Sequence, residues 1–88
     1  MLNIVTIKEV KIKIGQLCKA KRKEFNLTRE QLADALQMSR ATIQNIESGK
    51  NATLDNLLKM ANHFHLLETI FEGVQSLKHS SSDPLSLY

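Results

Sequence analysis

The sequence predicts an all-α fold, a single bundle of four to five short helices, from two kinds of pattern. Four hydroxyl residues, Thr6, Thr28, Ser39 and Thr53, stand where helix N-caps are expected, because such side chains accept hydrogen bonds from the free N–H groups of a first turn. Apolar residues then recur three and four positions apart after each cap, as they do along one face of a helix. The 88 residues, 42% of them hydrophobic, suffice for one core but not for a second domain.

The first helix follows Thr6, whose spacing to Glu9 fits a capping box and makes Ile7 the first helical residue. A stripe at helical spacing continues from it, made of Val10, Ile14, Leu17, Cys18 and Lys21. A short N-terminal strand is the competing interpretation, since the residues before Thr6 favour β structure. Residues 1–10 are therefore assigned to an N-terminal extension, and helix is expected from about Lys11 onward.

Two shorter helices follow, separated by a turn of a few residues. The first begins with a second capping box, Thr28 with Gln31, and the next begins after Ser39 and ends before Gly49. Their expected buried positions are Leu32, Ala33, Leu36, Ile43 and Ile46. Two helices joined by such a tight turn form a helix-turn-helix arrangement.

Two further apolar stripes lie nearer the C-terminus. The stripe after Thr53 consists of Leu54, Leu57, Leu58, Ala61 and Phe64. The last stripe consists of Leu67, Ile70, Phe71, Val74 and Leu77. Three interpretations of the last stripe stay open: a helix that pairs two subunits, a helix that folds back as extra core, or a strand over 67–71 that pairs between subunits. The domain organisation expected is a helix-turn-helix domain over 11–65, a dimerisation segment over 66–78 and a flexible tail over 79–88.

Charge is divided unevenly along the chain. The whole sequence has a formal net charge of +3, but residues 1–50 carry ten basic against five acidic side chains, a net +5, and residues 51–88 a net −2. A basic half suits a polyanionic partner, and the other half is then free for protein contacts.

The residues of the two short helices carry a family resemblance. The segments LTREQLADAL (27–36) and MSRATIQNIESGK (38–50) resemble the XRE/Cro family of transcriptional regulators, which includes the lambdoid phage repressors and the HipB-like antitoxins. The resemblance covers about residues 14–64. It implies a lambda-repressor-like fold, binding to double-stranded DNA and no cofactor.

In a helix-turn-helix the second helix presents its first turns to base edges in the major groove, while helix N-termini and nearby cations meet phosphates. The side chains expected to contact bases are Arg40, Ala41, Gln44 and Asn45. Those expected to contact phosphates are Thr28, Arg29, Ser39, Thr42, Lys50 and Asn51. Arg suits guanine, Gln and Asn suit adenine, and an Ala methyl suits the thymine methyl.

The resemblance also assigns two structural features. It makes Arg22 and Glu47 an internal ion pair between the end of the first helix and the end of the recognition helix. It also places Gln37 where the family usually has a glycine in the left-handed conformation, at a cost to Gln of about 1 kcal/mol.

Other readings of the sequence have less support. The residues Cys18, His63, His65 and His79 match no zinc-binding spacing, and no catalytic motif stands out, so neither a metal site nor an enzyme is predicted. A single cysteine, no apolar run of membrane-spanning length and no secretion signal predict a cytoplasmic protein with no membrane contact. The expected DNA binding makes it nucleoid-associated.

Taken together, these features predict a sequence-specific repressor that binds a palindromic operator as a homodimer. Within the resembled family, the small size, the basic character and the terminal tail favour an antitoxin that autoregulates its operon and binds a kinase-like toxin. The alternatives are a stand-alone or phage-type regulator, and a helical protein–protein adaptor that does not bind DNA.

Overall fold

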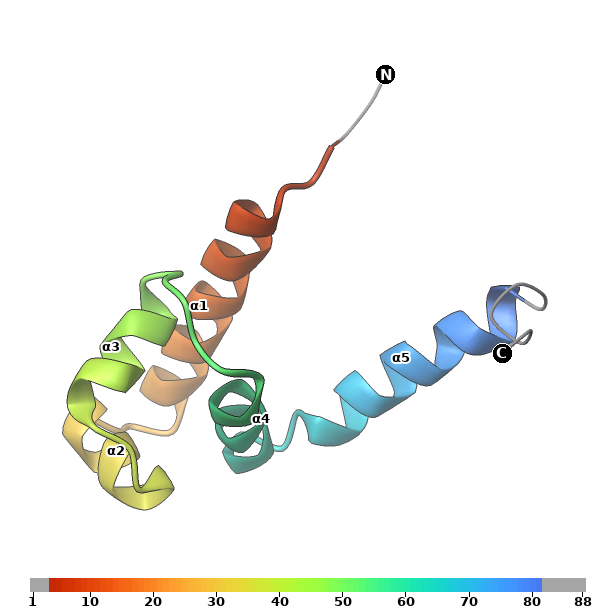
Figure 1. Ribbon diagram of the computed structural model, residues 1–88. Coiled ribbons are helices and arrows are strands. Elements are labelled where there is room, and N and C mark those ends of the chain that lie inside the picture. Colours follow the sequence, from red (N-terminus) through yellow and green to blue (C-terminus); the bar gives the residue numbers. More distant parts are fainter. Residues whose placement is uncertain (1–3, 82–88) are drawn as a thin grey trace.

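The computed structural model describes residues 4–81, and all its regular structure there is helical (Figure 1). The five helices are α1 (Ile7–Glu24), α2 (Arg29–Leu36), α3 (Arg40–Glu47), α4 (Leu54–His63) and α5 (Leu67–Ser81). The predicted all-α class is confirmed, and α5 is a helix over the segment for which a strand was an alternative.

The predicted caps begin the first four helices. Thr6 and Thr28 both form full capping boxes: Glu9 N–H donates to Thr6 Oγ1 over 3.1 Å, and Gln31 N–H donates to Thr28 Oγ1 over 3.0 Å. Ser39 and Thr53 cap α3 and α4 in the same way through their hydroxyl groups. Because α1 starts at the residue after its cap, helix runs through residues 7–10 of the expected N-terminal extension.

The core lies where α1, α2, α3 and α4 meet. It consists of Cys18, Leu32, Ala33, Ile43, Ile46, Met60 and Phe64. The buried positions predicted for α3 are confirmed, with Ile43 and Ile46 almost fully enclosed. Met60, which no predicted stripe included, is fully buried, whereas Leu54 at the first position of α4 is 71% exposed.

The apolar stripe of α1 is only partly used by this core. Cys18 is buried, but Val10, Ile14 and Leu17 are between 37% and 48% exposed. The N-terminal half of α1 extends beyond the bundle, away from α2 (Figure 1). This leaves an apolar helix face without a covering element among the described residues.

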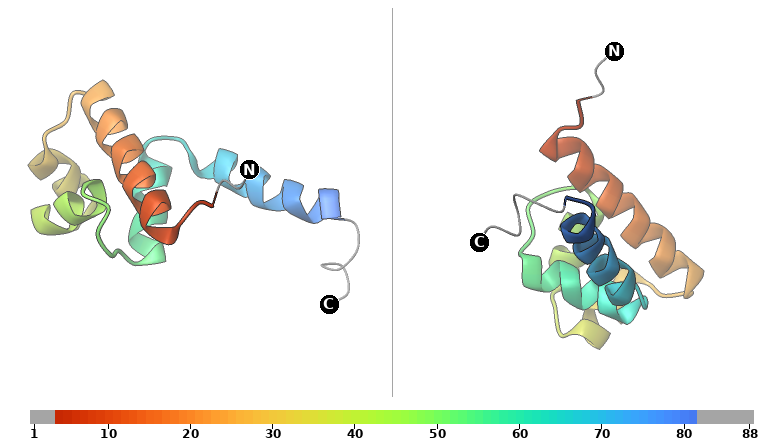
Figure 2. Two further views of the ribbon diagram at one scale, coloured as in Figure 1. Left: turned by 90° about the horizontal axis from the view of Figure 1, so that it is seen from above. Right: turned by 90° about the vertical axis from the view of Figure 1, so that its right-hand side faces the viewer.

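The helix α5 packs against α4 at its start and then runs outward (Figures 1 and 2). Its five stripe residues are all 39% to 65% exposed; they are Leu67, Ile70, Phe71, Val74 and Leu77. The interpretation that this segment folds back to enlarge the core is therefore wrong for the chain as described. The helix also covers positions 79–81 of the predicted tail, and the remainder of that tail, 82–88, lies outside the described residues.

Candidate nucleic-acid interface

The turn between α2 and α3 determines the orientation of α3 relative to α2. Gln37 ends α2 in the left-handed conformation, with φ 57° and ψ 45°, as expected for a position that favours glycine. Its backbone N–H donates to Asp34 O over 3.2 Å, and Met38 N–H donates to Ala33 O over 2.9 Å. These two bonds close the end of α2, so the turn keeps its geometry although it lacks the glycine.

Replacing Gln37 by glycine is expected to stabilise the fold. The left-handed conformation destabilises a residue with a Cβ by about 1 kcal/mol, whereas glycine adopts it without that steric penalty. We therefore expect Gln37→Gly to raise the melting temperature by roughly 4 °C or more, measured by circular dichroism. A lower melting temperature would show that contacts of the Gln37 side chain stabilise the fold by more than its left-handed backbone conformation destabilises it.

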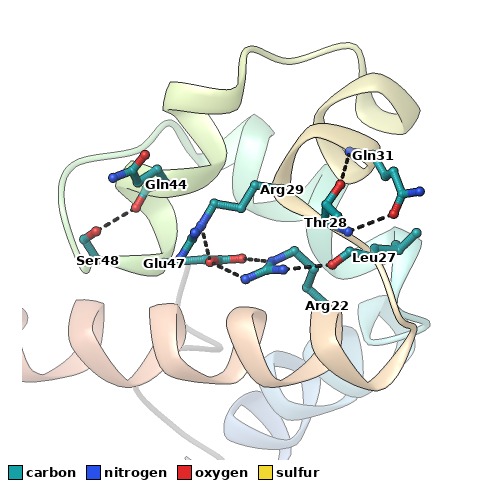
Figure 3. A network of polar contacts seen from close by, with 8 residues as sticks. All are labelled: Arg22, Leu27, Thr28, Arg29, Gln31, Gln44, Glu47 and Ser48. Atoms are coloured by element: carbon teal, nitrogen blue, oxygen red, sulfur yellow. Dashed lines mark hydrogen bonds and ion pairs between the residues drawn. The ribbon is translucent and has the colours of Figure 1, made fainter.

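The exposed face of α3 carries the four side chains predicted to contact bases. Arg40, Ala41, Gln44 and Asn45 are all exposed, while Ile43 and Ile46 hold the opposite face in the core. Within residues 4–81, no side-chain hydrogen bond or ion pair restrains Arg40, Gln44 or Asn45. Ser48 donates to the backbone oxygen of Gln44, which leaves the Gln44 amide free (Figure 3). Among the described residues, the side-chain donors and acceptors on this exposed face of α3 are therefore free of internal partners.

The N-termini of α2 and α3 lie beside this face and gather hydroxyl groups and cations. A shallow cleft of about 430 Å³ is lined there by Arg22, Leu27, Thr28, Arg29, Glu30 and Arg40. Helix N-termini carry partial positive charge and free N–H groups, which suits a phosphate. Ser39 Oγ and Thr42 Oγ1 are 2.9 Å apart, so these two hydroxyl groups share one site at the start of α3.

The remaining residues predicted to contact phosphates lie after α3. Lys50 and Asn51 are exposed in the loop that leads to α4. Asn51 Oδ1 accepts a hydrogen bond of 2.6 Å from Lys11 Nζ, which ties this loop to α1. Lys11 was not among the predicted site residues, because only the folded chain brings two positions 40 residues apart into contact.

A buried ion-pair network joins the end of α1 to the end of α3 (Figure 3). Arg22 Nε lies 2.7 Å from Glu47 Oε2, and Arg22 Nη2 lies 3.2 Å from Glu47 Oε1. A third Arg22 donor, Nη1, bonds Leu27 O over 2.8 Å. Only 8% of the Arg22 side chain and 2% of the Glu47 side chain are exposed, so the pair is internal and Arg22 is occupied by structural contacts.

Arg29 belongs to the same network, which the sequence did not indicate. Its Nε donates to Glu47 Oε1 over 3.0 Å, while 29% of its side chain remains exposed. One face of this guanidinium thus helps hold Glu47, and the rest lies at the cleft. Removing Arg29 would therefore disturb the network as well as the predicted phosphate contact, which makes Lys50 the cleaner probe of phosphate binding.

Cys18 lies in the core beside this network and is only 7% exposed. Burial, together with the negative charge of Glu47, raises the pKa of the thiol to about 11. The thiol is therefore protonated near neutral pH and is a poor nucleophile.

Over residues 4–81, no three His, Cys, Asp or Glu side chains come together as a metal site. His63 and His65 lie instead against the Phe25 ring, with ring centroids 6.4 and 6.3 Å away.

Comparison with known proteins agrees with this geometry. The sequence model of the HTH_3 helix-turn-helix family matches residues 19–69, from the last third of α1 to the start of α5. The chain belongs to the HTH_3 helix-turn-helix family. This membership makes it an XRE-type, DNA-binding transcription regulator. No curated protein matched the sequence.

The family match covers the whole helix-turn-helix but leaves two parts of the chain without a counterpart. These are the N-terminal half of α1 and most of α5, which both carry exposed apolar residues.

Across the part of the chain that the structure describes, no helix is long and apolar enough to cross a membrane.

Proposed function

We propose that this HTH_3 protein is a sequence-specific repressor that binds double-stranded operator DNA through the exposed face of α3. The observation that carries the proposal is the unrestrained set of base-reading side chains beside two hydroxyl-capped helix N-termini. Only residues free of internal partners can pair with base edges at no cost to the fold. Cytoplasmic, nucleoid-associated localisation accompanies this role and stays a prediction.

Each exposed residue of α3 has a chemical role in this proposal. Arg40 donates two hydrogen bonds to guanine O6 and N7, Gln44 and Asn45 pair with adenine, and the Ala41 methyl group contacts a thymine methyl. The phosphates on either side are held by Thr28, Arg29, Ser39, Thr42, Lys50 and Asn51. Such contacts position the protein but do not read sequence.

Binding to a palindromic operator requires two copies of the chain. One helix-turn-helix contacts a single half-site, and two half-sites about one helical turn apart need a two-fold dimer. The exposed α5 stripe supports this part of the proposal, because Leu67, Phe71 and Val74 are apolar and lie outside the core. The dimer therefore forms through α5, at the opposite end of the molecule from α2 and α3 (Figure 1).

Two substitutions separate base reading from phosphate binding. We expect Arg40→Ala to weaken binding to the selected operator by roughly 1–3 kcal/mol and to relax specificity at one base pair. Lys50→Ala should weaken binding to every sequence about equally and lower the salt slope of binding by about one. Electrophoretic shift over a salt series measures both effects.

The control for this pair is Lys59→Ala, because Lys59 lies on α4, is 52% exposed and pairs with Asp55 at 3.4 Å. Its operator affinity and salt slope should equal those of the unmodified protein. If Arg40→Ala and Lys50→Ala also leave binding unchanged, the α3 face is not the DNA-binding surface. If the unmodified chain shifts no duplex at all, the alternative of a helical protein–protein adaptor replaces the repressor.

The finer role within this function is that of an antitoxin which represses its own operon and binds a kinase-like toxin. Its support is the small size of the chain and the resemblance of its helix-turn-helix to HipB-like antitoxins. A stand-alone or phage-type regulator is the alternative. The antitoxin role is supported if the neighbouring gene encodes a kinase-like protein and that protein co-purifies with the full chain. An unrelated neighbouring gene supports the stand-alone or phage-type regulator.

A further inference from the structure

An apolar groove of about 340 Å³ lies between α1, α4 and α5. Its lining contains no charged residue; it consists of Ile14, Leu17, Cys18, Leu54, Leu57, Leu58, Ala61, Leu66 and Ile70. The groove opens between the N-terminal half of α1 and the outward-running α5, which diverge from each other in Figure 1. Its rim residues Leu17 and Leu54 are 48% and 71% exposed.

The two helices beside the groove carry stripes with the same spacing. On α1 the stripe is Ile7, Val10, Ile14 and Leu17, and on α5 it begins with Leu67, Ile70 and Val74. Both follow the alternating steps of three and four residues by which helices pack side by side. An apolar helix face of this kind therefore fits the groove in shape and chemistry.

The amount of exposed apolar surface indicates that the occupant is large. Nine bulky apolar side chains on α1, α4 and α5 are each 37% to 76% exposed; they are Ile7, Val10, Ile14, Leu17, Leu54, Leu67, Ile70, Phe71 and Val74. Monomeric proteins rarely expose a contiguous apolar patch above about 300–600 Å². A stable protein interface buries about 800 Å² on each partner, so exposed apolar side chains spread over three helices fit a protein partner rather than a small ligand.

Charge favours a second copy of the same chain as that occupant. The N-terminal half of α1 has three lysines, Lys8, Lys11 and Lys13, against Glu9. The helix α5 is acidic instead, with Glu68 and Glu72 against Lys78. Contact of α1 with the α5 helix of another copy brings opposite charges together, whereas α1–α1 or α5–α5 contacts bring like charges together.

We propose that α5 of a second copy lies in the groove between α1, α4 and α5, so that α1 forms half of the dimer interface. By two-fold symmetry, α5 of the first copy occupies the same groove of its partner, and the interface is a four-helix arrangement of both α1 and both α5 helices. This inference rests on the proposed homodimer and specifies its surface. It gives the N-terminal half of α1, which lies outside the family match, a role in assembly.

Sedimentation equilibrium of the full chain tests the inference with three variants. Leu17→Gln changes the α1 side of the interface, Val74→Gln changes the α5 side, and Ile4→Gln changes an exposed apolar residue away from the groove. We expect each of the first two to raise the dimer dissociation constant at least about tenfold, and Ile4→Gln to leave it unchanged. A melting curve for each variant shows that it is folded.

The outcomes separate this inference from the proposed function. If Val74→Gln dissociates the dimer and folded Leu17→Gln does not, the dimer uses α5 alone and the groove proposal is wrong. If the unmodified chain is monomeric at micromolar concentration, the homodimer itself is wrong. Binding to a single half-site, measured by electrophoretic shift, reports on the α3 surface independently of both.

Discussion

Glu47→Ala is expected to destabilise this protein more than any other single truncation considered. The substitution leaves the Arg22 guanidinium, whose side chain is 8% exposed, buried without its counter-ion. Breaking a buried pair in this way typically costs about 3–5 kcal/mol, a large share of the ~5–15 kcal/mol that stabilises a small domain. The melting temperature should fall by more than about 10 °C, measured by circular dichroism.

The matched control for Glu47→Ala is Glu24→Ala at the end of α1, the helix that also carries Arg22. Glu24 also pairs with a cation, Lys21 Nζ at 3.3 Å, but its side chain is 64% exposed. Water replaces that partner, so the stability should change by no more than about 0.5 kcal/mol. Equal melting temperatures for the two variants would contradict the structural role assigned to the network.

Gly15→Ala is expected to have the second largest effect, because α1 crosses α3 at this residue. A Cβ on Gly15 would lie 2.5 Å from Ile46 O and 2.7 Å from Glu47 O, and both are backbone atoms. The helices must separate to admit a methyl group, which costs about 1–3 kcal/mol and outweighs the better helix propensity of alanine. Chemical denaturation should show a lower free energy of unfolding.

Gly73→Ala supplies the opposite expectation within the same chain. Gly73 also lies inside a helix, α5, but no atom approaches within 4 Å of its Cβ position. Alanine there should stabilise α5 by about 0.5–1 kcal/mol through propensity alone. If both substitutions were stabilising, the close crossing of α1 and α3 would not exist in solution.

Local features of this fold were predictable from the sequence because they depend on neighbouring residues. Caps such as Thr6 and Thr28 act on N–H groups three positions away, and the spacing of Ile43 and Ile46 places both on one face of α3. The left-handed turn at Gln37 was expected from the resemblance and was confirmed.

Features that depend on how the helices cross were not predictable. Gly15 has no local signature of a close crossing, since its contacts lie on α3. The bond of Arg29 to Glu47 and that of Lys11 to Asn51 join residues 18 and 40 positions apart. Met60 is fully buried because of where α4 packs, which the spacing of leucines on that helix did not indicate.

The exposed face of α3 is expected to read a DNA sequence. The most direct test of this expectation is selection of bound duplexes from a random DNA library by the full chain, followed by electrophoretic shift of the enriched sequence. We predict a palindromic sequence bound at least about a thousandfold more tightly than random duplex at the same salt concentration. Equal affinity for enriched and random duplexes, or no binding to either, would contradict it.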